Sequence, residues 1–133
     1  MLHIDYCPDW TLADARRELM QNALDAGLIA HTSHRLVSKG HIDPRSFILG
    51  YSSKRTDSSK LGQFGEGLKL AMLVFEREAQ PINIYAADKR YTTERVEVKG
   101  ETTIDIVAYD CPSDDQDNTV IVFSQAQDWS STY

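Results

Sequence analysis

The sequence predicts an α+β fold, and two observations support that prediction. Apolar residues recur at helical spacing in the first part of the chain and again after residue 67. Four strand-like segments follow Pro81. The 133 residues fit one compact domain, taken as residues 1–133. The predicted order is therefore helix, glycine loop, helix and then an antiparallel sheet, which gives a two-layer α/β sandwich.

The first helix is the clearest element of the sequence. Thr11, followed three residues later by Asp14, is typical of an N-cap with an acidic reciprocal partner. The helix then carries one apolar stripe, made of Leu12, Ala15, Leu19, Ala23 and Ala26. Gly27 supplies a C-terminal stop, so a helix is expected over roughly residues 11–26.

The middle of the chain has weaker patterns. His34–Ser38 is expected to be a short strand, with a turn at Lys39-Gly40. Gly50–Lys60 is rich in Ser, Lys, Arg and Asp and is expected to be a mobile surface loop. Leu68–Glu78 has the apolar periodicity of a second helix.

The last third of the chain has β character. Four segments show alternation or enrichment in β-branched residues: Ile82–Ala86, Thr92–Val98, Thr103–Tyr109 and Thr119–Phe123. Asp88-Lys89 and Lys99-Gly100 suit hairpin connections between them.

Composition excludes several classes of function. The net charge of −6 argues against a surface that binds nucleic-acid backbones, which needs clustered Lys and Arg. The two cysteines are far apart and have no metal-ligand spacing. No apolar run approaches the ~18 residues of a membrane span, so we expect a soluble, cytoplasmic protein without membrane contact.

The first predicted helix carries three polar residues close together. Glu18, Asn22 and Asp25 fall within an arc of about 60°, at about 100° per residue, and this arc borders the apolar stripe. Burying such groups unpaired costs roughly 1–3 kcal/mol each, so their position at the edge of the core suggests a site. Three solvated side chains on an ordinary helix are the alternative, and the spacing alone leaves both open.

A glycine-rich segment precedes the second predicted helix. Gly62, Gly65 and Gly67 could expose backbone N–H groups toward an anion, and the dipole of the following helix would add a favourable potential. The segment lacks both the dinucleotide-binding fingerprint and the Gly-Lys-Ser/Thr ending of a P-loop. It therefore predicts a phosphate-binding loop of another kind.

These two segments resemble motifs of the GHKL ATPases, the superfamily that includes the ATPase component of DNA gyrase, heat-shock chaperones, histidine kinases and MutL. Glu18–Gly27 resembles the first helix motif, in the style of MutL and topoisomerase VI, and Gly62–Gly67 resembles the second glycine box. Ser52–Lys54 resembles the lid segment of MutL. Leu49–Ala71 is similar to a group of bacteriophage-encoded GHKL-type proteins. The resemblance covers roughly residues 9–75.

The resemblance implies a Bergerat fold, with helices packed on one face of a mixed, mostly antiparallel sheet and ATP between helix and lid. It implies that Asn22 coordinates Mg²⁺, that Glu18 acts as general base, and that Asp25 completes the motif. Lys54 would add charge from the lid, and Thr119 would help to fix the adenine through water. The phosphates would be held by the backbone of Gln63, Phe64, Gly65, Glu66 and Gly67.

The sequence departs from the family in the first glycine box. No Asp stands at the head of the matching segment near Ser38–Ile42, although Asp43 follows it. The expected function is an ATP-binding protein, phage-encoded and so in the host cytoplasm, with slow or negligible Mg²⁺-dependent hydrolysis. One alternative is a non-enzymatic module on a degenerate scaffold, which binds a host protein or forms a homodimer. Another is the N-terminal piece of a larger ATPase.

Overall fold

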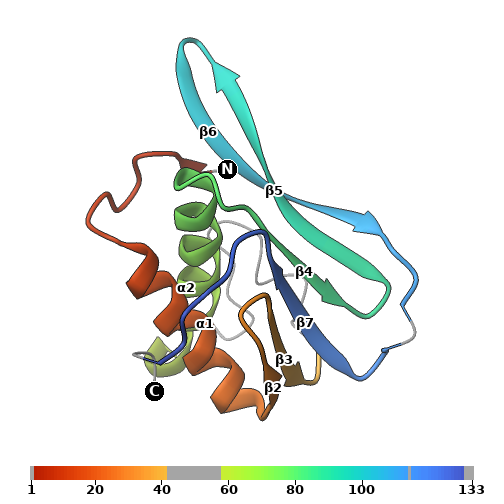
Figure 1. The fold of residues 1–133 in the computed structure, drawn as a ribbon. Helices are drawn as coiled ribbons and strands as arrows, with labels where there is room; N and C mark the ends of the chain where they lie inside the picture. Colours follow the sequence, from red (N-terminus) through yellow and green to blue (C-terminus); the bar gives the residue numbers. More distant parts are fainter. Residues whose placement is uncertain (1, 42–57, 114, 131–133) are drawn as a thin grey trace.

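The computed structural model describes residues 2–41, 58–113 and 115–130, except for the side chains of residues 58–66. Within these ranges the chain forms two helices and seven strands (Figure 1). The helices are α1 (Leu12–Ala26) and α2 (Ser58–Arg77). The strands are β1 (Leu2–His3), β2 (Leu28–His31), β3 (Arg35–Lys39), β4 (Ile82–Ala86), β5 (Lys89–Val98), β6 (Glu101–Asp110) and β7 (Asn118–Phe123).

All seven strands belong to one sheet, in the order β1-β6-β5-β4-β7-β3-β2. Every pairing among the described strands is antiparallel. The predicted α+β class, a helix-packed Bergerat sandwich on a mixed sheet, is therefore wrong: the protein is mostly β, with only two helices in its described part. The prediction missed β1 and β2, which extend the sheet at its two edges and shift the balance of the fold toward strands.

The helices share one face of the sheet, and the core lies between the two layers (Figure 1). Leu19 of α1 and Phe75 of α2 are buried there together with Ile84 of β4. The Phe75 and Phe123 rings lie 5.5 Å apart, and Phe123 lies 5.2 Å from Trp129. The alternation of β4, with Ile82, Ile84 and Ala86 buried, is the pattern of a strand with one face on the core.

The predicted first helix is confirmed, including its caps. The Thr11 side chain accepts a hydrogen bond from the Asp14 N–H at 3.3 Å, and Asp14 Oδ2 accepts one from the Thr11 N–H at 2.8 Å. Gly27 ends the helix at φ +114° and donates its N–H to Ala23 O. These contacts join residues close in sequence, which explains why the sequence could predict them.

The predicted loop at Gly62–Gly67 is wrong, because α2 runs without interruption from Ser58 to Arg77. The second half of α2 is buried on all sides over Gly67–Glu76. Each glycine in a helix costs about 1 kcal/mol relative to alanine, and we attribute the longer helix to the packing of this buried half. Neither described helix combines the length and apolarity that a membrane crossing requires.

Two tight hairpins connect β4, β5 and β6. Ala87 and Asp88 form the first turn, and Lys99 and Gly100 form the second. Lys99 and Gly100 have φ of +51° and +81°, as in the turn that matches the twist of a hairpin. The predicted turn at Lys99-Gly100 is confirmed, whereas the turn predicted at Asp88-Lys89 lies one residue earlier, because Lys89 is already the first residue of β5. β5 was predicted to begin at Thr92 and β6 at Thr103, but both strands begin earlier. The reason is that every residue of this hairpin is paired with the opposite strand from the turn onward.

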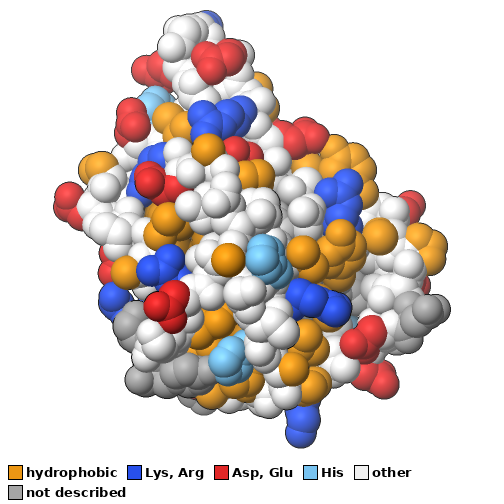
Figure 2. All heavy atoms as spheres, in the orientation of Figure 1, with side chains coloured by type: hydrophobic (Ala, Val, Ile, Leu, Met, Phe, Trp, Pro, Cys, Tyr) orange, Lys and Arg blue, Asp and Glu red, His pale blue; other side chains and the backbone are white. Residues whose placement is uncertain are grey.

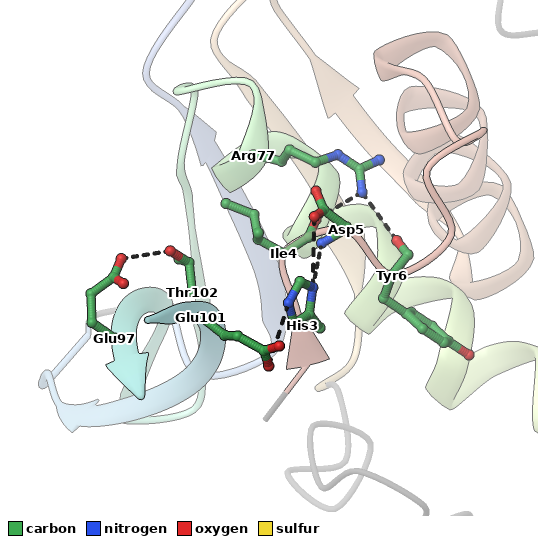
Figure 3. Close-up of polar contacts among 8 residues, drawn as sticks. All are labelled: His3, Ile4, Asp5, Tyr6, Arg77, Glu97, Glu101 and Thr102. Atoms are coloured by element: carbon green, nitrogen blue, oxygen red, sulfur yellow. Dashed lines mark hydrogen bonds and ion pairs between the residues drawn. The ribbon is translucent and has the colours of Figure 1, made fainter. Parts of the chain in front are cut away.

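The N-terminal segment is attached to the end of α2 by one arginine (Figure 3). The guanidinium of Arg77 donates to the carbonyls of Ile4 and Tyr6 at 3.0 Å, and also to those of Cys7 and Trp10. His3 lies between the carboxylates of Asp5 and Glu101 at 3.9 and 3.8 Å. The short β1 is thus held by side chains in addition to its pairing with β6.

Candidate functional site

The helix pair meets at a contact between Glu18 of α1 and Gly67 of α2. Gly67 is buried, and a Cβ placed on it would lie 2.5 Å from Glu18 Cδ and 3.1 Å from Oε2. Carbon atoms in proteins do not approach to the shorter of these distances, so the Glu18 carboxyl group occupies the space that any side chain at position 67 would need.

Asn22 lies one turn along α1 from Glu18, and its Nδ2 donates to Glu18 Oε1 at 3.4 Å. Burial raises the pKa of the Glu18 carboxyl group above its ordinary value. The hydrogen bond from Asn22 lowers the pKa and opposes that effect, whereas the negative charge of Asp25 raises it further. Both side chains are half-buried, so the interpretation of a fully solvated trio does not hold for them.

Asp25 lies at the exposed end of the same arc. Its Oδ1 accepts a hydrogen bond from Gln21 Nε2 at 3.0 Å. The alternative of a solvated side chain therefore describes Asp25 well. Its influence on the site is the charge that it places near Glu18.

Thr119 lies on the sheet, on the inner face of β7, where it pairs with Ser38 of β3. It is buried, and its hydroxyl group donates to the carbonyl of Gly40 at 2.7 Å. Gly40 has φ +79° and donates its own N–H to Asp117 O. Thr119 thus fixes the turn that follows β3, and its predicted contact with an adenine stays a prediction.

The remaining predicted residues contribute less to the observed geometry. Lys54, Ser52 and Asp43 lie outside the described residues. The backbone from Gln63 to Glu66 is helical, and in a helix each N–H bonds to a carbonyl four residues earlier. These N–H groups are therefore not turned toward a ligand, and their role in holding phosphates stays a prediction.

Two charged residues that were not predicted from the sequence are buried in α2. Lys69 is 2% exposed and Glu76 is 9% exposed. Glu76 accepts hydrogen bonds from Thr93 Oγ1 at 2.8 Å and Arg95 Nε at 3.2 Å, which anchors the helix to β5. The sequence does indicate that Lys69 is buried, because it is the one charged residue within the otherwise apolar run from Leu68 to Phe75.

Comparison with known proteins identifies a relative but no family. No family model matches the chain. The chain is 29% identical over 100 residues to an uncharacterized protein of Mycoplasma pneumoniae. The match covers 63% of this chain and 40% of that protein, so the chain spans less than half the length of its relative.

Proposed function

We propose that this protein binds ATP in the manner of the GHKL ATPases, with the phosphate and Mg²⁺ end of the site at Glu18 and Asn22. One observation carries the proposal: a half-buried carboxylate on α1 lies directly against the bare backbone of Gly67 on α2. A glycine and a glutamate from the two motifs that resemble the superfamily are thus in contact, although they are 49 positions apart in the sequence (67 − 18).

The chemistry of the two side chains fits a hydrated magnesium ion and a phosphate. Mg²⁺ takes oxygen ligands and keeps several waters, so few protein groups are needed to hold it. Asn22 uses its Nδ2 on Glu18, which leaves its amide oxygen as the ligand. When bound, the ion would neutralise charge on the phosphates. Glu18, whose pKa is raised by burial, is suited to accept a proton from water as general base.

Phosphate binding by Gly62–Gly67 requires part of α2 to open. The N–H groups of this segment bond within the helix, but glycines at positions 62, 65 and 67 make that helix weak by about 1 kcal/mol each. Bound phosphates would replace the lost hydrogen bonds with charge-assisted ones. We therefore propose that the first half of α2 exchanges between helix and phosphate loop, and that the nucleotide selects the loop.

The test is calorimetric titration with a non-hydrolysable ATP analogue, with and without Mg²⁺, paired with thermal unfolding. Binding to the folded chain alone must raise the melting temperature. Asn22→Ala should remove the dependence on Mg²⁺, and Glu18→Ala should spare binding and reduce any hydrolysis. Gln21→Ala, at the exposed neighbour, is the matched control and should change neither. No heat and no shift of the melting temperature at millimolar analogue would refute the proposal.

A further inference from the structure

The face of the sheet opposite the helices is open in the described part of the chain. The inner face carries α1, α2 and the segment with Trp129, whereas neither helix packs on the outer face (Figure 1). Strand register aligns the outer residues into rows that cross five strands in the order β3-β7-β4-β5-β6. One row consists of Val37, Val120, Tyr85, Arg90 and Tyr109. The next consists of Arg35, Val122, Asn83, Thr92 and Val107.

These rows form an apolar band with partial solvent access. Val37, Val122, Tyr85 and Val107 are half-buried and Tyr109 is 41% exposed, whereas Val120, in the middle of its row, is buried between them at 8% exposed. Figure 2 shows hydrophobic side chains gathered over this part of the sheet, with Lys and Arg side chains among them. Contiguous apolar surface of this kind marks an interaction site more often than isolated exposed residues do.

Arg90 is held within the band. Its guanidinium lies 4.8 Å from the centre of the Tyr109 ring, and its Nη1 donates to Asn83 Oδ1 at 2.8 Å. A stacked and hydrogen-bonded arginine of this kind tolerates loss of water better than a free charge does. Arg90 is therefore compatible with a covered surface.

The two sides of the band carry opposite charges. Arg35 and Lys39 lie on the β3 side. Glu94 and Asp105 lie opposite each other on β5 and β6, one row beyond the row of Arg35. A twofold axis that runs parallel to the strands near β4 would place the β3 side of one copy against the β6 side of the other. The band is thus complementary in charge to itself.

We propose that this face is the interface of a homodimer in which two sheets pack face to face. The apolar rows lie at its centre, and Arg35 of each copy lies opposite Val107 on β6 of the other, with Asp105 and its neighbour Glu94 one row farther along the strands. This arrangement is independent of the nucleotide site, because Glu18 and Gly67 lie in the helix layer on the opposite side of the sheet.

The size of the face indicates a weak, transient interface rather than a permanent one. Strands lie about 4.8 Å apart and rows on one face about 6.8 Å apart, so three rows over five strands, counting the row of Glu94 and Asp105, cover roughly 500 Å² per copy. Two copies would bury on the order of 1,000 Å², which is near the lower limit for a specific interface. We therefore expect a concentration-dependent dimer with a micromolar dissociation constant.

The sheet edges are less suitable for a second copy. β2 has only four residues and its register with β3 shifts between Leu28 and Ala30. A short strand with a bulge is a common means by which proteins prevent pairing at an edge. β1, at the other edge, has two residues and pairs only with Thr103 and Ile104 of β6. The rest of β6 has no neighbouring strand on that side in the described part of the chain, but Asp105 and Asp110 place negative charges along it, which oppose pairing with a second copy.

Sedimentation velocity tests the dimer at protein concentrations from about 1 to 500 µM. This range brackets the micromolar dissociation constant expected for an interface of this size. Arg35→Glu and Glu94→Arg should each weaken self-association at least 10-fold, because they place like charges together. An equimolar mixture of the two variants should restore it, since the introduced glutamate then lies near the introduced arginine and the native Arg35 lies near the native Glu94. Arg17→Glu and Glu78→Arg, at exposed positions of the helix layer, are the matched controls and should leave it unchanged.

Two results would overturn the proposal. One is a monomer over the whole concentration range, whatever other molecule the face binds. The other is a dimer that both single variants form as well as the native chain does, which would assign the dimer to another surface. Circular dichroism and the melting temperature of each variant separate loss of the interface from loss of the fold, and the restored mixture cannot be explained by unfolding.

Discussion

The carboxyl group of Glu18 lies where the first side-chain carbon of residue 67 would stand. At this point α1 and α2 meet through a carboxylate and a bare backbone, whereas elsewhere apolar side chains of both helices, such as Leu19 and Phe75, lie in one core. A half-buried carboxylate with a raised pKa weakens the fold at neutral pH. Groups that reduce stability in this way are found at functional sites.

Gly67→Ala should displace the Glu18 carboxyl group, because the new methyl group would lie 2.5 Å from Glu18 Cδ and that group is the free end of a half-buried side chain. The better helix propensity of alanine offsets part of this cost, so we expect a net loss of at most about 1 kcal/mol. Urea unfolding measures the loss. The double variant Gly67→Ala with Glu18→Ala should recover much of it, since the shorter side chain leaves room for the methyl group. Effects that simply add in the double variant would show that the two residues do not compete for this space.

Glu18→Gln should raise the melting temperature at pH 7 by about 1–3 °C. The pKa of Glu18 is raised in the folded state, so the folded chain holds this proton more tightly than the unfolded chain does. The stability that this bound proton contributes is fully present at pH values below the pKa of Glu18 in the unfolded chain. It is lost as pH rises through the pKa of Glu18 in the folded chain. The difference between the two proteins should therefore shrink as pH falls and vanish at about pH 3, well below the pKa of about 4.3 of an unfolded glutamate. Glu78→Gln, at an exposed position, should change the melting temperature at neither pH.

Gly62→Ala and Gly65→Ala should each strengthen α2, by about 0.5–1 kcal/mol, because alanine is the better helix former. If the nucleotide selects an opened segment, both changes should also weaken binding of the ATP analogue several-fold. Far-ultraviolet circular dichroism and calorimetry measure the two effects on the same samples. Tighter binding by either variant would contradict the exchange between helix and loop.

Arg77→Ala should release the N-terminal segment and cost about 2–3 kcal/mol, because the guanidinium satisfies carbonyls of four residues at once. Arg77→Lys should recover little, since an ammonium group cannot reproduce the fork of donors. Hydrogen exchange should rise at the amide of Ile4, which now bonds to Thr102 O. Arg17→Ala is the control, because its ion pair with Asp14 is exposed and worth little.

Local signals in the sequence were sufficient for α1, for β4 and for the turn at Lys99-Gly100, and they gave the other hairpin turn to within one residue. Thr11, Asp14 and Gly27 act on neighbours within four residues, and β4 matches the predicted Ile82–Ala86 at both ends. β1 and β2 could not be found in this way. Each is short and gains its hydrogen bonds from strands elsewhere in the chain, as in the pairing of Leu2 with Ile104. Missing them led to the wrong fold class.

In the candidate site, too, the sequence could predict only the relationships between residues that lie close together along the chain. The arc of Glu18 and Asn22 followed from helical spacing, and their hydrogen bond agrees with it. The closeness of Gly67 could not be predicted, because it depends on how α2 lies against α1. The glycines at 62, 65 and 67 were interpreted as a loop that exposes backbone N–H groups toward an anion, but α2 continues through them.

β7 is the last of the described strands to be synthesised, yet it lies inside the sheet between β4 and β3. Until residues 118–123 leave the ribosome, the described strands can form only two separate half-sheets, β6-β5-β4 with β1 and β3-β2, each with an unprotected edge. Such edges pair readily with other chains. The sheet therefore closes in a single late step, and a stalled or truncated product that ends before Asn118 should aggregate or be degraded.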